Sequence, residues 1–234
     1  MWIAGADGCP AGWLVVFRAI NGQSPRAQIF KKITDAFEQQ ERLKILAVDI
    51  PIGLATTSRK GGRCADVEAR KVLGLRKSSI FPAPSRAVLK ARSPAEAREI
   101  EKRNSDPPKS LAKQVINLLD KIRQLDAIAA RYSGIIFECH PEVSFWMMNE
   151  CREMSFPKRT LDGFNERCGI LTRNGYDRSF LTTRVGSYKE HGRDDLPDAC
   201  AAAWTAERIF RKEAVCFPAK PKPDDCGLNV AIWA

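Results

Sequence analysis

The chain has 234 residues, of which 44% are hydrophobic, so it can bury a substantial core, and we expect one domain, 1–234, with insertions. Its 38 Lys/Arg and 28 Asp/Glu residues give a net charge of +10, which favours nucleic acid or a nucleotide phosphate as partner. No apolar stretch approaches the roughly 20 residues of a membrane span, and we expect neither a membrane anchor nor a secretory leader. The eight cysteines form no C-x-x-C pair and only two histidines are present, which disfavours a zinc site and favours reduced thiols in the cytoplasm.

Three short apolar runs open the chain and predict three strands, at 2–7, 12–20 and 27–33, which we expect to pair as an antiparallel meander. A short helix is predicted next, over 34–42. The run 44–53 is almost continuously apolar, as expected of a fourth strand that is covered on both faces of its sheet.

A long helical segment is predicted after the fourth strand, with helices at 64–74, 93–104 and 109–131. Residues 59–131 hold 18 Lys/Arg and 8 Asp/Glu, so they carry the whole net charge of +10. This basic insertion, about 55–132, is the expected contact surface for a polyanion. Mixed charge on its two longer helices is also typical of a solvated helix face, and that alternative stays open.

The remaining elements complete an α/β domain: a fifth strand at 134–142, helices at 160–173 and 196–212, and a short final strand at 229–234. Prolines between 218 and 223 are expected to break regular structure. The order predicts a ribonuclease-H-like mixed sheet, in which a three-strand antiparallel meander is extended by parallel strands through helical crossovers. The helical insertion separates the fourth and fifth strands.

Acidic residues lie at the ends of these elements. Asp7 ends the first predicted strand, Asp49 the fourth and Glu138 the fifth. Asp195 and Asp198 are three residues apart at the start of the closing helix, so both can face the same way. If strands one, four and five are parallel neighbours, their carboxyl ends share one edge of the sheet, where open α/β sheets bind ligands.

Carboxylates crowded at one edge repel each other unless a cation neutralises them. Ligands that are all oxygen favour Mg²⁺ or Mn²⁺, and two such ions about 3.5–4 Å apart can activate water and stabilise the leaving oxygen in phosphodiester cleavage. We therefore expect the five acids to be both catalytic and metal-binding. Asp7 would be the bridging ligand, with Asp49, Glu138 and Asp195 or Asp198 as outer ligands.

Each acid also has a structural alternative. Asp7 and Asp49 precede residues typical of turns, where an aspartate often accepts backbone hydrogen bonds. Glu138 lies between apolar neighbours and could pair with an arginine. At the closing helix, Asp194 or the next residue could be the N-cap, and Asp198 could simply favour the helix dipole. Because acids lie at the ends of three strands and at the start of one helix, we favour a shared ligand site.

Six segments carry a resemblance to a known family. They are GADGCPAGW (5–13), AVDIPIGL (47–54), RCADVEARKVLGLRKSSIFPAPSR (63–86), FECHPEVSF (137–145), KRTLDGFNERCGIL (158–171) and DDLPDACAAAWTAER (194–208). Together they resemble the domain-of-unknown-function 429 family, whose members are predicted nucleases of ribonuclease H fold, and the resemblance spans almost the full length.

The resemblance implies a ribonuclease-H-like fold and a metal-dependent nuclease or phosphodiesterase that acts on nucleic acid. Its acidic motif positions correspond to Asp7, Asp49, Glu138, Glu142, Asp195 and Asp198. Its polar positions, from which we take the substrate-binding candidates, include Arg63, Arg70, Arg76, Ser78, Ser79, Lys158 and Arg167.

Two other functions stay open. The segments near the acids are rich in arginine, serine and proline, which could build a closed pocket for a small-ligand phosphotransferase or nucleotide hydrolase of the same superfamily. A non-catalytic nucleic-acid-binding or scaffold protein would share the positive charge without the chemistry. The sequence does not define the oligomeric state.

Overall fold

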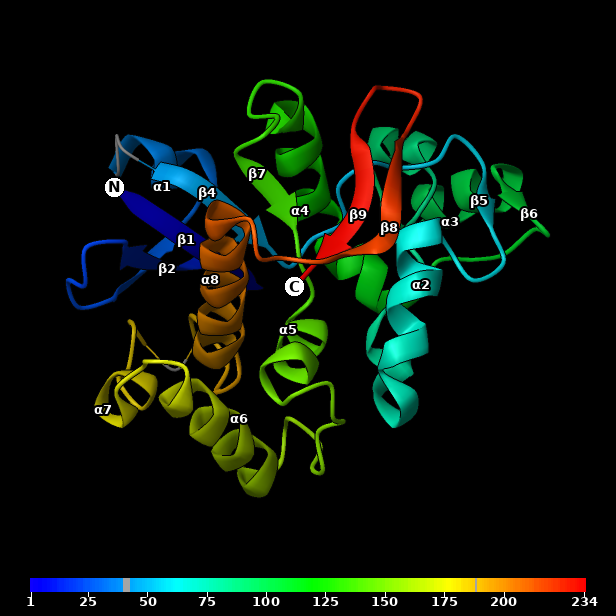
Figure 1. The fold of residues 1–234 in the computed structure, drawn as a ribbon. Helices are drawn as coiled ribbons and strands as arrows, with labels where there is room; N and C mark the ends of the chain where they lie inside the picture. Colours follow the sequence, from blue (N-terminus) through cyan, green and yellow to red (C-terminus); the bar gives the residue numbers. More distant parts are fainter. Residues whose placement is uncertain (40–42, 188) are drawn as a thin grey trace.

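The computed structural model describes residues 1–39, 43–187 and 189–234. Its centre is a five-stranded mixed sheet in the order β3-β2-β1-β4-β7 (Figure 1). The first three strands form an antiparallel meander, and β4 and β7 extend it in parallel from β1, as predicted. The strands are β1 (Trp2–Cys9), β2 (Gly12–Ala19), β3 (Arg26–Phe30), β4 (Leu43–Val48) and β7 (Ile136–Glu138).

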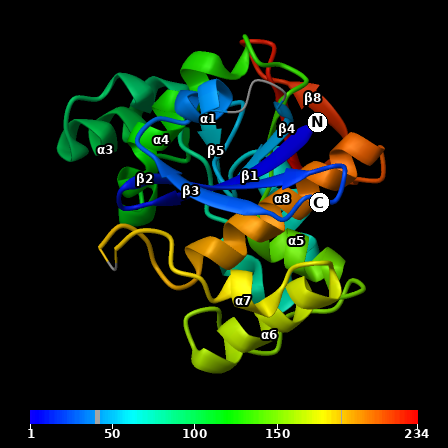
Figure 2. The same ribbon diagram turned by 90° about the vertical axis from the view of Figure 1, so that its left-hand side faces the viewer.

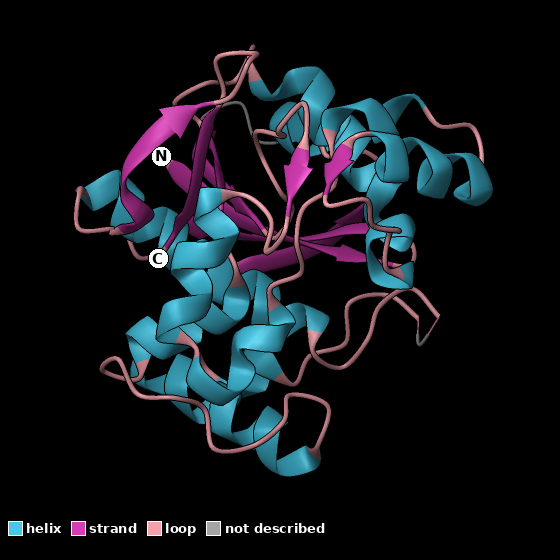
Figure 3. Cartoon of the chain, turned by 90° about the vertical axis from the view of Figure 1, so that its right-hand side faces the viewer, coloured by secondary structure: helices cyan, strands magenta, loops and turns pink. Residues whose placement is uncertain are grey.

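Helices cover both faces of this sheet (Figures 2 and 3). Along β1, Ile3 packs into a cluster with α8, whereas Ala4 and Ala6 pack into a cluster with α4, because successive side chains of a strand point to opposite faces. The helices on the first face are α5 (Pro141–Met148), α6 (Leu161–Arg173), α7 (Arg178–Leu181) and α8 (Asp195–Arg211). Those on the second are α1 (Thr34–Gln39) and α4 (Lys113–Ala129).

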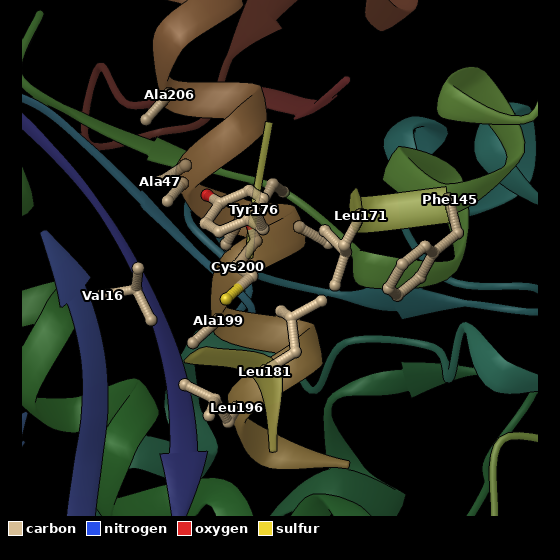
Figure 4. Close-up of a cluster of buried hydrophobic side chains, with 14 of the residues drawn as sticks. Val16, Ala47, Phe145, Leu171, Tyr176, Leu181, Leu196, Ala199, Cys200 and Ala206 are labelled. Carbon is tan, nitrogen blue, oxygen red and sulfur yellow. Dashed lines mark hydrogen bonds between the residues drawn. The ribbon is translucent and has the colours of Figure 1, made fainter. Parts of the chain in front are cut away.

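Helix α8 approaches the sheet more closely than side chains would ordinarily allow. A Cβ atom placed on Gly5 of β1 would lie 2.0 Å from the backbone nitrogen of Ala203 and 2.3 Å from the carbonyl oxygen of Ala199. Only glycine permits this contact between backbones. Figure 4 shows α8 side chains, among them Ala199 and Cys200, packed between the strands and α6–α7. The packing brings the start of α8 to the carboxyl end of β1.

The segment between β4 and β7 is mostly helical. Glu101 is fully buried there and accepts hydrogen bonds from the Ser58 hydroxyl (2.6 Å) and the Ser85 backbone N–H (2.9 Å). It thereby connects its own helix to the chain around these two serines. The elements of this segment are β5 (Ser58–Arg59), α2 (Cys64–Val72), the 3₁₀ helices η1 (Gly74–Ser79) and η2 (Arg86–Lys90), α3 (Pro94–Arg103), β6 (Ser105–Asp106) and α4.

The fourth and fifth strands are much shorter than predicted. The fourth ends at Val48 because Pro51 has no N–H to donate, and the next N–H, of Ile52, bonds to the carboxylate of Glu138 at 2.7 Å. The fifth spans only three residues, since Pro141 begins helix α5, which the sequence analysis did not predict. The predicted end of the first helix, 40–42, lies outside the described residues.

The prolines near the chain end do not prevent strand formation. Strand β8 (Cys216–Pro223) contains Pro218, Pro221 and Pro223. Among the described residues it pairs only with β9 (Asn229–Trp233), so prolines can occupy its other side. This hairpin packs against α2 and meets β7 through a bridge between Cys139 and Trp233. All eight cysteines are free thiols. Among the described residues, no helix has the length and apolar character that crossing a membrane requires.

Candidate functional site

A cavity of about 760 Å³ opens where β1, β4 and the start of α8 meet. Its acidic wall comes from three elements of the sequence that are far apart in the chain. Five aspartates make up this wall, Asp7, Asp49, Asp194, Asp195 and Asp198, and Glu142 lines another part of the cavity. Four of these five were predicted to share a site, and the structure brings those four together.

Strand register explains why the first two acids face the same cavity. Ala6 of β1 pairs with Val48 of β4 in parallel, and the N–H of Asp49 donates to the carbonyl of Ala6 at 3.1 Å. Asp7 and Asp49 are the next residues of this register, so both side chains point to the face that α8 covers. Asp7 Oδ1 accepts a hydrogen bond from the following N–H, of Gly8, at 2.7 Å.

The other acids come from the first turn of α8. Asp194 is the N-cap residue, but its side chain makes no capping hydrogen bond. Asp195 Oδ2 instead accepts from the backbone N–H of Gly192 at 2.7 Å. Asp198 is only 1% exposed, and its Oδ1 has no hydrogen-bond partner. A buried carboxylate oxygen without a partner is costly, which makes Asp198 the strongest sign that the cavity takes a ligand.

The acids perturb one another. Burial raises the pKa of Asp7 well above its usual value, and the charges of Asp49, Asp198 and Asp195 raise it further. Burial also raises the pKa of Asp49 and of Asp198 to about 7, although the charge of Lys158 acts against both shifts. Near neutral pH the cluster therefore holds protons or a cation more readily than an ordinary surface carboxylate would.

The side chain of Lys158 contacts this wall. The Nζ atom of Lys158 lies 2.8 Å from Asp198 Oδ2 and 3.1 Å from Asp194 Oδ2. Burial acts to lower the pKa of Lys158, but the charges of Asp198 and Asp194 raise it above its usual value, so the ammonium stays charged. For Asp194, burial raises the pKa, and the charge and hydrogen bond of Lys158 outweigh that and lower it.

Glu138 lies outside this cavity, on the opposite face of the sheet. It pairs with Val48, whose side chain packs in the cluster with α4, so its carboxylate points away from Asp49. There it forms two hydrogen bonds with the guanidinium of Arg63, at 2.6 and 2.8 Å. Arg63 also bonds Asp66 at 2.6 Å, and all three residues are buried.

Most of the predicted substrate-binding side chains have structural partners. Arg63 is committed to Glu138, and Arg167 is 1% exposed and pairs with Glu142 at 2.6 Å. Arg70 donates to the carbonyls of Ile80 and Gly61. Of the others, Arg76 reaches the Ser155 carbonyl at 3.5 Å and Ser78 does not line the cavity, whereas Ser79 and Lys158 do.

The opposite wall of the cavity holds polar side chains that sequence reasoning did not single out. Lys113, Gln114 and Asn117 of α4 line it and make no side-chain hydrogen bond in the described part of the chain. Arg159 also lines the cavity, and its charge acts on Asp194 of the acidic wall. Gln114 and Asn117 are three residues apart and so lie on one side of α4, but the other polar and charged residues of this helix hide that signal in the sequence.

His140 and Glu142 form a third part of the lining. Burial lowers the pKa of His140, so its ring is neutral near pH 7, and its Nδ1 has no hydrogen-bond partner. Glu142 uses Oε1 for Arg167, and its Oε2 is buried without a partner. Together with the acidic wall, these residues line the cavity with many oxygen ligands, and several of the polar atoms have no hydrogen-bond partner.

The donor set fits Mg²⁺ or Mn²⁺ in its chemistry, because the aspartates offer only oxygen ligands. In residues 1–39, 43–187 and 189–234, no three His, Cys, Asp or Glu side chains are already gathered around one point as a bound ion requires. Carboxylates without a cation repel each other, so a metal-free acidic cluster is expected to be wider than a metal-bound one.

Comparison with known protein families matched residues 5–223 to the family described as "Protein of unknown function (DUF429)". No curated protein and no solved structure gave a match. The matched region includes every acid of the cavity and Lys158. Since it covers nearly the whole chain, the protein belongs to the family "Protein of unknown function (DUF429)".

Proposed function

We propose that this protein is a divalent-metal-dependent phosphodiesterase that acts on nucleic acid and has a ribonuclease-H-like fold. The observation that carries the proposal is the meeting of Asp7, Asp49, Asp195 and Asp198 in one cavity at the carboxyl ends of parallel strands. The sheet order, with an antiparallel meander extended by two parallel strands, supports the fold assignment.

Asp7, Asp49 and Asp198 are the residues that would hold Mg²⁺ or Mn²⁺. When bound, such an ion activates a water molecule and neutralises charge on the attacked phosphate. The chain itself supplies the cavity walls that orient the phosphodiester. Lys113 and Arg159 offer positive charge to phosphate oxygens, and Lys158 neutralises part of the acidic wall.

The opposite wall indicates how the rest of a nucleotide would be held. Gln114 and Asn117 carry both donor and acceptor groups, which suit the edge of a base or the hydroxyls of a sugar. The cavity volume lies within the roughly 300–1,000 Å³ of small-molecule sites. We therefore expect one nucleotide of a flexible single strand to enter, and a duplex to be a poorer substrate.

The same volume favours one alternative, a hydrolase of free nucleotides. Arg63 and Arg167, which were predicted to bind substrate, are buried in ion pairs. Fewer basic side chains are therefore free to contact phosphates than the net charge suggests. A hydrolase of free nucleotides would use the same acids and the same amide side chains, and would not gain from a longer strand.

The experiment compares mononucleotides, single strands of increasing length and duplexes, each with Mn²⁺. We expect turnover of single strands that increases with length and is lost in Asp7→Asn. The matched control is Asp162→Asn, which removes an exposed carboxylate of α6 that does not line this cavity. Turnover of mononucleotides alone would favour the alternative, and no turnover with any divalent ion would reject both.

A further inference from the structure

Lys158 is held in place by the loop that precedes α6. Thr160 is the N-cap of this helix: its hydroxyl accepts from the N–H of Gly163 at 3.0 Å and donates to the carbonyl of Pro157 at 2.7 Å. A Cβ atom on Gly163 would lie 1.9 Å from that same carbonyl, so the turn is tightly packed against the helix. The backbone on both sides of Lys158 is therefore fixed, which limits where its ammonium can go.

The ammonium occupies one end of the acidic wall. It lies 2.8 Å from Asp198 and 3.1 Å from Asp194. These two residues are one helical turn apart at the start of α8. The first distance is that of a charge-assisted hydrogen bond and the second that of an ion pair. The two carboxylate oxygens that face Lys158 are thus already neutralised by a cation that belongs to the chain.

The other end of the wall has no such cation. In the part of the chain that the structure describes, neither Asp7 nor Asp49 forms an ion pair. Asp198 lies between the two ends, since its Oδ2 bonds Lys158 while its Oδ1 is buried without a partner. An oxygen of that kind in a residue that is 1% exposed needs a ligand of its own.

We infer that Lys158 takes the place of a second metal ion, so that the site binds one divalent cation, held by Asp7, Asp49 and the free oxygen of Asp198. The inference rests on the proposed metal-dependent function and replaces the two-ion arrangement that clustered acids first suggest. Lys158 acts as a positioning residue: it fixes Asp198 and keeps Asp194 from coordinating.

The test is the number of Mn²⁺ ions bound, measured by titration calorimetry and by electron paramagnetic resonance. The wild-type protein is expected to bind one ion and to give the spectrum of isolated Mn²⁺. Lys158→Met removes the ammonium but keeps a long apolar chain, and it is expected to bind two ions with a spin-coupled spectrum. Arg152→Met, which removes an exposed charge that pairs with Glu150 and does not line this cavity, is expected to stay at one ion.

Two further variants guard against a folding defect. Lys158→Gln is a second neutral replacement and is expected to bind two ions, and Lys158→Arg keeps the charge and is expected to bind one. Two ions in the wild-type protein, or one in both neutral variants, would overturn the role of Lys158 and leave the metal-dependent function standing. No binding to wild-type protein at millimolar Mn²⁺ would overturn both.

Discussion

Replacing Asp49 by asparagine is expected to stabilise the metal-free protein, and to do so more at pH 8 than at pH 5. Burial raises the pKa of Asp49 from its ordinary 3.8 to about 7, so the folded protein disfavours the ionised carboxylate. A raised pKa of this kind contributes stability that is fully present below about pH 4 and is lost as the pH rises through 7. Asp49→Asn has no carboxylate at this position, so it does not show this loss of stability.

The size of the effect follows from the pKa difference. At about 1.4 kcal/mol for each tenfold change in the ionisation constant, a shift from 3.8 to about 7 corresponds to about 4 kcal/mol at pH 8. Asp49 keeps part of its surface exposed, and its ionisation depends on those of Asp7 and Asp198, so water and proton sharing reduce this figure. We expect the variant to gain about 1–2 kcal/mol at pH 8 and much less at pH 5.

The assay is urea unfolding at pH 5 and pH 8 in the presence of EDTA, with Asp162→Asn as the exposed control. The control should unfold at the wild-type midpoint at both values. In saturating Mn²⁺ the order should reverse, because the wild-type protein gains an ion that Asp49→Asn binds poorly. An equal gain at both pH values, or a less stable variant at pH 8 without metal, would refute the electrostatic account of the cluster.

Three more outcomes follow from the structure. Mn²⁺ at 100 times its dissociation constant should add about 2.7 kcal/mol and raise the melting temperature by about 5–10 °C, measured by calorimetry, and this shift should vanish in Asp7→Asn. Arg63→Met leaves two buried carboxylates without their cation and should cost about 3–5 kcal/mol in urea unfolding, whereas a cost below about 1 kcal/mol would contradict a buried ion pair. If Lys113 and Arg159 contact phosphates, replacing either with alanine should lower the slope of log affinity against log salt by about 0.7 for a single strand, and an unchanged slope would place them outside the interface.

Hydrophobic pattern was enough to predict the five strands of the central sheet, and their order along the chain then indicated how they pair. The apolar runs of β1 and β4 each depend on local burial, which the residue types report directly. The boundaries were less predictable where a proline intervened. Pro141 begins a helix inside the segment expected to continue the fifth strand, and α5 is buried nearly all round, so it has no polar face to reveal its period.

The sequence predicted which acids lie at the ends of strands, but not which face of the sheet each side chain occupies. Asp7, Asp49 and Glu138 all lie at carboxyl ends, but the face that each side chain takes depends on register between strands. Glu138 pairs with Val48 and so points away from the other two. Its partner, Arg63, is 75 residues away in the chain, a distance over which sequence pattern carries no information about contact.

The contact at Gly5 has a consequence for how the acids are spaced. Asp7 belongs to the strand and Asp198 to the helix, and the distance between these two elements is set where the Gly5 backbone touches Ala199 and Ala203. One methyl group at position 5 would push the helix outward and carry its carboxylates with it. The separation of these carboxylates is thus set by the main chain, so substitutions outside the cavity can change that separation.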